Sequence, residues 1–161
     1  MILVLLGTQN NSFHRLLEEI EKLKKQGKIN QEIMVQAGYT KYKSDYMQIF
    51  DFTSKEDLEK LNEKAEYIIT HGGVASIQTA IRIGKKVIAV PRLHEYQEHV
   101  NDHQKEIVNL FADKGYIIGI SGVEELEQAI EKIPNFIPKT FQRDNHKIIS
   151  IIEDYIDSII L

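Results

Sequence analysis

The sequence predicts an α/β fold: a single doubly wound parallel sheet with helices on both faces. Short runs rich in Ile, Val and Leu alternate with helix-period segments along the whole chain, which is typical of a parallel sheet. Most of these runs are apolar throughout, as in strands that are buried on both faces. The 161 residues contain no linker, internal repeat or low-complexity tract, so residues 1–161 are expected to form one domain.

In the first half of the chain, two helices are expected between apolar runs. The first covers residues 13–26, with Ser12 as its N-cap and Gly27 as its C-cap. The second covers residues 53–65 and begins with a variant of the capping box at Ser54. The strands expected in this half cover residues 2–6, 32–38, 46–52 and 66–70.

The second half continues the alternation. A helix over residues 75–83 is expected to end at Gly84, and a long polar loop over residues 91–101 follows the next strand. The strands expected here cover residues 86–90 and 116–120. The further helices expected here cover residues 102–114, 122–133 and about 145–160.

Composition excludes several classes of protein. A net charge of -4 and a pI near 5.9 argue against a nucleic-acid-binding surface. The absence of cysteine excludes disulfides and thiolate metal sites. No basic region precedes the short apolar start, and no segment approaches the roughly 20 apolar residues that span a bilayer. Any membrane role is therefore expected to come through a partner or a surface helix.

Two glycine-containing loops follow strands directly, where open α/β sheets bind ligands. Gly7 and Thr8 follow the first strand, and His71, Gly72 and Gly73 lead to Ser76 at the start of a helix. Bare backbone and unpaired helix N–H groups there would suit a diphosphate. The alternative is a glycine turn that only closes the strand–helix unit. Neither loop is a Walker A or a G-x-G-x-x-G sequence, which weakens the ATPase and dehydrogenase hypotheses.

A third polar cluster is the stretch PRLHEYQEHVNDHQKE, residues 91–106. His99 and His103 are four apart, which is a metal-ligand spacing on a helix, but a loop is expected at His99 and no H-E-x-x-H motif forms. No metal site is therefore expected. Paired donors and acceptors favour a hydroxyl-rich ligand instead. The candidate binding residues here are Arg92, Glu98, Asn101, Asp102, His103 and Gln104.

These motifs resemble the UDP-sugar-binding half of family 28 GT-B glycosyltransferases. The Gly-Thr loop, the turn THGG and the segment VPRLHEYQEHVNDHQ are also similar to the catalytic subunits of two-component bacterial capsule and exopolysaccharide glycosyltransferases. The resemblance covers residues 1 to about 133. It implies a Rossmann-like domain equivalent to the C-terminal, donor-binding half of a GT-B enzyme.

The resemblance also implies roles for individual residues. Gly7 and Thr8 would approach the phosphates or the sugar, and the turn at residues 71–76, with Gly72, Gly73 and Ser76, would hold the diphosphate without a metal or cofactor. The sugar hydroxyls would bind Asp102, His103 and Gln104, and the uracil pocket would begin at Val90 and Arg92. An inverting displacement at the anomeric carbon needs a base. His14, His71 and His99 are the candidates, with a base on the partner as the alternative.

Three positions depart from the family pattern. Ala75 replaces a glycine before the serine, Thr79 replaces a glutamate that grips the ribose, and Gln9 replaces a histidine of the bacterial group. Ribose recognition by a carboxylate and acid–base chemistry in the first loop are therefore both in question. The departures motivate a different hypothesis, in which the chain is a non-catalytic nucleotide-sugar-binding or regulatory subunit.

A GT-B enzyme needs two such domains facing a cleft, and 161 residues supply one. The resemblance implies that a membrane-anchored partner binds the lipid-linked saccharide acceptor and holds this cytoplasmic chain at the inner face of the plasma membrane. The helix at about 145–160 has a wide apolar surface that would suit the core, docking or homo-oligomer formation. A stand-alone sugar-nucleotide epimerase or hydrolase is another alternative. The bacterial group uses UDP-galactose and UDP-glucuronate, between which the sequence does not choose.

Overall fold

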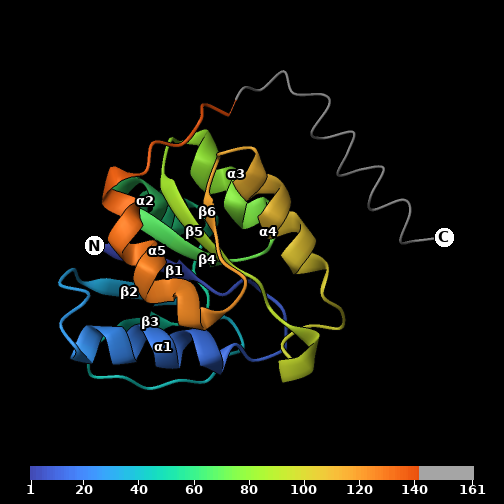
Figure 1. Ribbon diagram of the computed structural model, residues 1–161. Coiled ribbons are helices and arrows are strands. Elements are labelled where there is room, and N and C mark those ends of the chain that lie inside the picture. Colours follow the sequence, from blue (N-terminus) through green and yellow to red (C-terminus); the bar gives the residue numbers. More distant parts are fainter. Residues whose placement is uncertain (142–161) are drawn as a thin grey trace.

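The computed structural model describes residues 1–141, which form a six-stranded parallel sheet between two layers of helices (Figure 1). The strand order is β3-β2-β1-β4-β5-β6, and each adjacent pair is parallel. The strands are β1 (Ile2–Leu5), β2 (Ile33–Gln36), β3 (Gln48–Phe50), β4 (Tyr67–His71), β5 (Lys86–Val90) and β6 (Ile118–Gly119). This confirms the doubly wound prediction. The order reverses between β1 and β4, and such a switch point is where open α/β sheets bind ligands.

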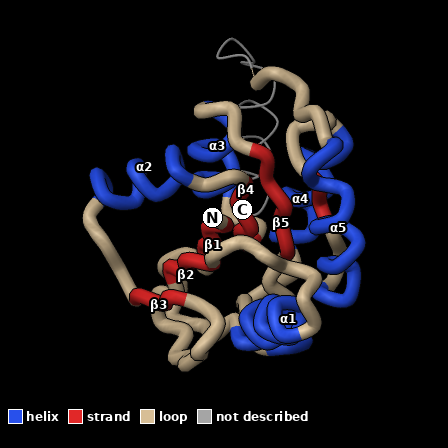
Figure 2. Tube along the Cα trace, turned by 90° about the vertical axis from the view of Figure 1, so that its left-hand side faces the viewer, coloured by secondary structure: helices blue, strands red, loops and turns tan. Residues whose placement is uncertain are grey.

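The helices divide between the two faces of the sheet (Figure 2). One face is covered by α1 (His14–Lys25) and α5 (Leu126–Lys132), the other by α2 (Lys55–Lys64), α3 (Val74–Arg82) and α4 (His103–Asp113). Three short 3-10 helices cover His94–Tyr96, Val123–Glu125 and Ile133–Asn135. Two hydrophobic clusters result, one on each side of the sheet.

The central strand β1 supplies both clusters. Ile2, Val4 and Leu6 pack on the α1 and α5 side, while Leu3 and Leu5 pack on the α3 and α4 side. All five side chains are buried, because successive residues of a strand point to opposite faces and both faces are covered. The apolar run ILVLL therefore reads correctly as a strand with no solvent face.

The helix ends confirm two of the three caps predicted for α1 and α2. Ser54 Oγ accepts the Asp57 N–H at 3.1 Å and caps α2. Gly27 has a φ of +72° one residue beyond the C-cap of α1, the position where a left-handed glycine ends a helix. The prediction for Ser12 is wrong. Phe13 is the N-cap of α1, and the Ser12 hydroxyl lies 2.6 Å from Nδ1 of His14 instead.

The last predicted elements differ more from the structure. The strand expected over residues 116–120 is only Ile118–Gly119, and the final helix at about 145–160 lies outside the described residues.

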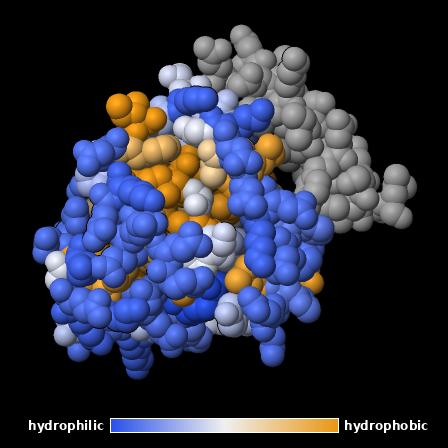
Figure 3. Space-filling view, in the orientation of Figure 1, coloured by the Kyte–Doolittle hydropathy of each residue, from blue (hydrophilic) through white to orange (hydrophobic). Residues whose placement is uncertain are grey.

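On the face shown in Figure 3, hydrophilic atoms surround a hydrophobic hollow over β6, between α5 and α4. None of the helices within residues 1–141 has the length and hydrophobicity that a bilayer crossing requires.

Candidate functional site

Three loops meet at the carboxyl edge of the sheet, above the switch point. They follow β1, β4 and β5. The first and third are joined to each other although β4 lies between their strands: Asn11 Nδ2 donates to the Gln97 carbonyl at 2.8 Å, and Arg92 Nη1 donates to the Asn11 carbonyl at 2.8 Å. Gln9 and His99 also meet, with their Nε2 atoms 3.1 Å apart. The loops that the sequence singled out thus form one structure.

The His71 ring explains two of the glycines. A Cβ on Gly73 would lie 2.2 Å from His71 Nε2, and a Cβ on Gly7 would lie 2.6 Å from His71 Cε1. Gly7 also has a φ of +80°, which other residues rarely adopt. The imidazole therefore fills the space that side chains at these positions would need. Packing against His71 is enough to explain why glycine stands at these two positions. It agrees with the alternative in which the glycines only form a turn.

Gln104 plays the matching part at Gly72. Its Oε1 accepts N–H groups from Gly72 and from Arg92, each at 3.0 Å. A Cβ on Gly72 would lie 2.7 Å from the Gln104 Cβ. The buried Gln104 side chain therefore joins the turn after β4 to the loop after β5, and its carbonyl oxygen is already engaged by the protein.

His71 is neutral near pH 7. Burial, followed by the Arg92 charge, lowers its pKa to about 4, and its Nδ1–H donates to the Leu5 carbonyl at 3.3 Å. With the proton on Nδ1, Nε2 carries a lone pair beside Gly73. The site thus contains a neutral imidazole rather than a cation.

The N-terminus of α3 follows this turn, with Gly73 as its N-cap. It has no side-chain cap and no acidic residue in its first turn, whereas α2 has both Ser54 and acidic residues. Ala75 is exposed and Ser76 is half-buried in that first turn. Its N–H groups and the helix dipole are available to an anion at the switch point.

Two of the predicted binding side chains are committed to the protein itself. Glu98 is buried, and its carboxylate accepts hydrogen bonds from Nε and Nη2 of Arg15, the latter at 2.8 Å. Arg92 is 1% exposed, and its guanidinium donates to the carbonyls of Leu6, Asn11 and Glu98. Burial lowers the Arg92 pKa to about 10. These side chains shape the loops, and their polar groups are engaged within the protein.

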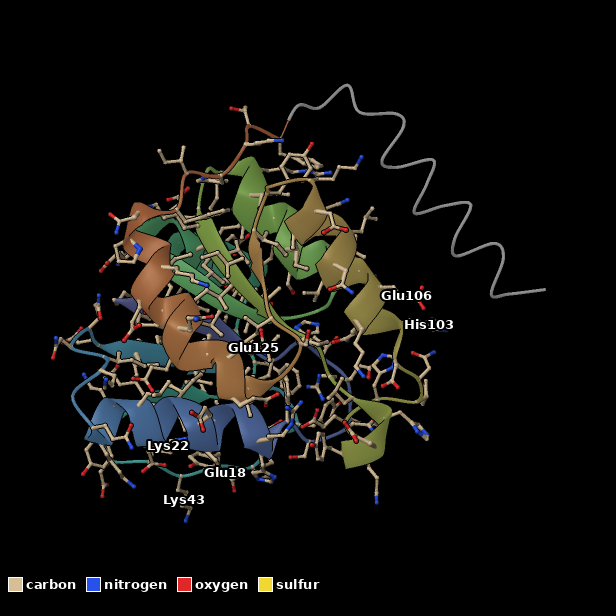
Figure 4. The ribbon with its side chains drawn as sticks, viewed as in Figure 1. Glu18, Lys22, Lys43, His103, Glu106 and Glu125 are labelled. Carbon is tan, nitrogen blue, oxygen red and sulfur yellow. The ribbon has the colours of Figure 1, made fainter. Side chains whose placement is uncertain are left out.

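The remaining predicted residues lie toward the surface. Thr8 is exposed, and His103 begins α4 with Glu106 one turn later (Figure 4). The Asp102 carboxylate accepts the His94 N–H at 2.8 Å, and Asn101 Oδ1 accepts the His103 N–H at 3.3 Å. These contacts order the end of the loop after β5.

The other two candidate bases are His14, the first residue of α1, and His99, in the loop after β5. His14 Nε2 donates to the Lys41 carbonyl at 2.7 Å, so Nδ1 is the nitrogen that faces Ser12. His99 Nδ1 accepts the Asn101 N–H at 3.3 Å. Each ring is thus oriented by main-chain groups. Neither orientation leaves a lone pair without a neighbouring donor.

Sequence reasoning missed two features of this edge. One is Arg15, the partner of Glu98, for which the sequence pattern predicts a place in a helix and no role in the site. Tyr39 and Phe52 form an edge-to-face pair with centroids 5.3 Å apart, each about half-exposed, just after β2 and β3. Tyr39 comes three residues after β2 and Phe52 two residues after β3, so an aromatic residue just past each strand end is the signal that could have found this pair.

The model of the glycosyltransferase family 28 C-terminal domain matches residues 1–159. The chain belongs to this family.

Known relatives agree with this assignment. The UDP-N-acetylglucosamine transferase subunit ALG13 of Candida albicans is 26% identical over 113 residues, which are 70% of this chain and 37% of that protein. Two solved structures share the fold of this family 28 domain. One is the MurG structure from Acinetobacter baumannii (22% identity, TM-score 0.58, 83% of this chain and 41% of that one). The other is the glycotransferase of kitacinnamycin (16% identity, TM-score 0.59, 82% and 34%).

The family 28 domain thus spans less than half the length of each of these proteins. The fold likeness confirms the expected equivalence to one Rossmann-like half of a GT-B glycosyltransferase. Within residues 1–141 of the domain, no three His or acidic side chains gather as metal ligands. The described edge offers N–H groups, amides, hydroxyls, the Asp102 carboxylate and a neutral imidazole.

Proposed function

We propose that this chain is the donor-binding catalytic subunit of an inverting, metal-independent UDP-sugar glycosyltransferase. It would extend a lipid-linked polysaccharide repeat unit together with a membrane-associated partner subunit. The observation that carries the proposal is the uncapped N-terminus of α3 at the switch point, beside the neutral ring of His71. Its membership of family 28 and its relation to a UDP-N-acetylglucosamine transferase subunit support the same conclusion.

The diphosphate is assigned to the turn that joins β4 to α3. N–H groups of the first turn of α3 and the Ser76 hydroxyl would donate hydrogen bonds to its oxygens. These donors are fixed before the reaction, so they stabilise the negative charge that grows on the departing UDP at little reorganisation cost. This would replace the divalent cation that other glycosyltransferases use.

The nucleoside is assigned to the side of β2 and β3. On the β5 side of the diphosphate turn, the buried side chains of Arg92 and Glu98 fill the space with protein contacts. On the other side, Tyr39 and Phe52 expose ring surface two to three strands away, about 10–14 Å at the usual strand spacing. A planar base stacks well on such rings. The pocket at Val90 and Arg92 that the family resemblance implies is the alternative place for the base.

The sugar is assigned to the start of α4, where Asp102, His103 and the Gln104 amide would recognise its hydroxyls. UDP-galactose and UDP-glucuronate remain the donors that the bacterial resemblance implies. The ALG13 relative is named for UDP-N-acetylglucosamine, so that donor belongs in the same test. The base that deprotonates the acceptor is assigned to the partner or to one of His14, His71 and His99.

The partner would supply the acceptor half of the enzyme. The ALG13 relative is itself described as a subunit, and the fold matches cover only 34–41% of the two solved chains. We place the chain in the cytoplasm, at the inner face of the plasma membrane, through an anchored partner that binds the lipid-linked saccharide.

Calorimetric titration of the chain with UDP, with and without EDTA, tests the proposal. Wild type is expected to bind UDP equally in both conditions. Ala75→Asp should weaken binding at least about tenfold, because a carboxylate in the first turn repels the diphosphate. The same carboxylate favours the helix dipole, so the variant should stay folded. Ala75→Ser is the matched neutral control and should bind as wild type does. Loss of binding in EDTA, or equal binding by Ala75→Asp, would contradict the proposal.

A further inference from the structure

The loop after β5, residues 91–102, has little regular structure of its own. It contains the 3-10 turn His94–Tyr96 and then Gln97, which has a left-handed φ of 56°. Gln97 is the one non-glycine residue with positive φ among residues 1–141. Such a loop keeps one conformation only where side chains hold it. The contacts of its buried residues therefore determine the position of α4 and of its residue Gln104.

One side chain outside the loop contacts three of its residues. Arg15 of α1 donates from Nε to Glu98 Oε1 at 3.0 Å and from Nη2 to Glu98 Oε2 at 2.8 Å. Its Nη2 also lies 3.4 Å from the Pro91 carbonyl, and its guanidinium lies 4.5 Å from the centre of the Tyr96 ring. The arginine thus contacts the beginning, the middle and the end of the loop.

Glu98 passes this constraint to the main chain. Its Oε2 also accepts the Leu93 N–H at 3.0 Å, and its side chain is 4% exposed, against 17% for Arg15. Such a buried, two-pronged pair is far more sensitive to loss of one partner than a surface ion pair, because the remaining carboxylate would stay buried without its counter-charge. The next residue toward the strand, Arg92, gives its own N–H to Gln104 Oε1, which also holds Gly72.

We infer that Arg15 is a positioning residue of the donor site: through Glu98 it fixes the 91–102 loop, and with it the Gln104 bridge to the glycine turn. The inference rests on the proposed function, since it concerns the same site. The inference assigns Arg15 no contact with the donor itself. Glu98, expected from the sequence to bind substrate, becomes the intermediate through which Arg15 acts.

The test compares Arg15→Gln, Glu98→Gln and the double variant with Lys22→Gln. Lys22 lies on the same helix, is ion-paired with Glu19 at 2.7 Å, and lies well away from His103 (Figure 4). Amide hydrogen exchange of the ligand-free chain reports the loop, and UDP titration reports the site. Arg15→Gln should speed exchange at Leu93 and Gly72, and weaken UDP binding, by about tenfold or more, with the β1 amides unchanged. Lys22→Gln should match wild type in both.

The double variant shows whether Arg15 acts through Glu98. Removing both charges leaves no bare buried carboxylate, so the double variant should lie closer to wild type than Arg15→Gln does. Additive effects would overturn the route through Glu98. Wild-type exchange and UDP affinity in a folded Arg15→Gln would overturn the positioning role while leaving the proposed function intact. A folded wild type that binds no UDP would instead overturn the proposed function, and this inference with it.

Discussion

His71 shows how a single side chain can set the electrostatics of this edge. Its ring is enclosed by Gly7 and Gly73, and the Leu5 carbonyl fixes which nitrogen carries the proton. Burial and the nearby guanidinium of Arg92 keep it neutral at physiological pH. A histidine that charged readily would be a simpler anion ligand. Here the positive potential comes from the helix, and the imidazole supplies packing and one oriented lone pair.

The depressed pKa of His71 makes stability depend on pH. The unfolded chain protonates this residue near 6.5, whereas the folded chain does so only near 4, so unfolding takes up a proton between these values. Stability present above pH 6.5 should therefore fall by up to about 3 kcal/mol as the pH drops to 4. Urea unfolding across this range should show that fall in wild type and a flatter curve in His71→Asn. Parallel curves would contradict the pKa assignment.

Gly73 gives a second prediction at this scale. A methyl group there would overlap His71 Nε2, so Gly73→Ala should destabilise the fold by about 1–3 kcal/mol through overpacking. Urea unfolding measures this. Combining it with His71→Ala should cost less than the sum of the two single changes, because the clash is gone. Additive losses would show that the ring and the glycine do not compete for the same space.

At the scale of elements, α2 and α3 are built alike but begin differently. Both follow a strand and lie on the same face of the sheet, yet α2 caps itself with Ser54 while α3 begins at a bare glycine. The difference costs α3 local stability, since a capping side chain typically contributes about 1 kcal/mol. A ligand anion would restore that contribution. Because α1 also lacks a side-chain cap and an acidic first turn, the glycine turn that precedes α3 is the further reason for assigning the diphosphate there.

The aromatic pair beyond β2 and β3 allows the nucleoside assignment to be tested separately. Phe52→Ala should weaken UDP binding by about 1–2 kcal/mol, roughly 5- to 30-fold, because a stacked base loses its platform. Binding of pyrophosphate alone should not change. Tyr46→Ala is the matched control, since Tyr46 is also about half-exposed but lies over Lys25 of α1. Equal UDP affinities in the three proteins would place the base elsewhere.

The sequence predicted the elements well where a local pattern determines them. The strand ILVLL, the cap at Ser54 and the turn before α3 all follow from residues that are neighbours in the chain. The partners of the site do not, because Arg15 and Glu98 are 83 positions apart and His71 meets Gly7 only after folding. The prediction of Ser12 as an N-cap is wrong for a similar reason. Phe13 is the N-cap, and its N–H donates to the hydroxyl of Thr40, which belongs to a different loop.

At the scale of the whole molecule, the proposed function makes the chain one face of a cleft. We expect that the chain alone binds donor without transferring sugar, and that transfer from UDP-sugar to a lipid-linked acceptor begins when the anchored partner is co-expressed. Mass spectrometry of the lipid product measures this with each of the three candidate donors. Ala75→Asp with the partner should give less product at limiting donor, and the partner expressed without the chain controls for its own activity. Transfer or turnover by the lone chain would instead favour the stand-alone enzyme.

The two outer strands have a consequence for how the protein behaves before it meets a partner. Within the described residues, β3 has three residues and β6 has two. A sheet grows onto another chain through the unpaired N–H and C=O groups of its edge strands, and edges this short provide few of them. Copies of the chain therefore have little to template a shared ladder. Pairing of sheet edges should therefore contribute little to any association between copies of the chain.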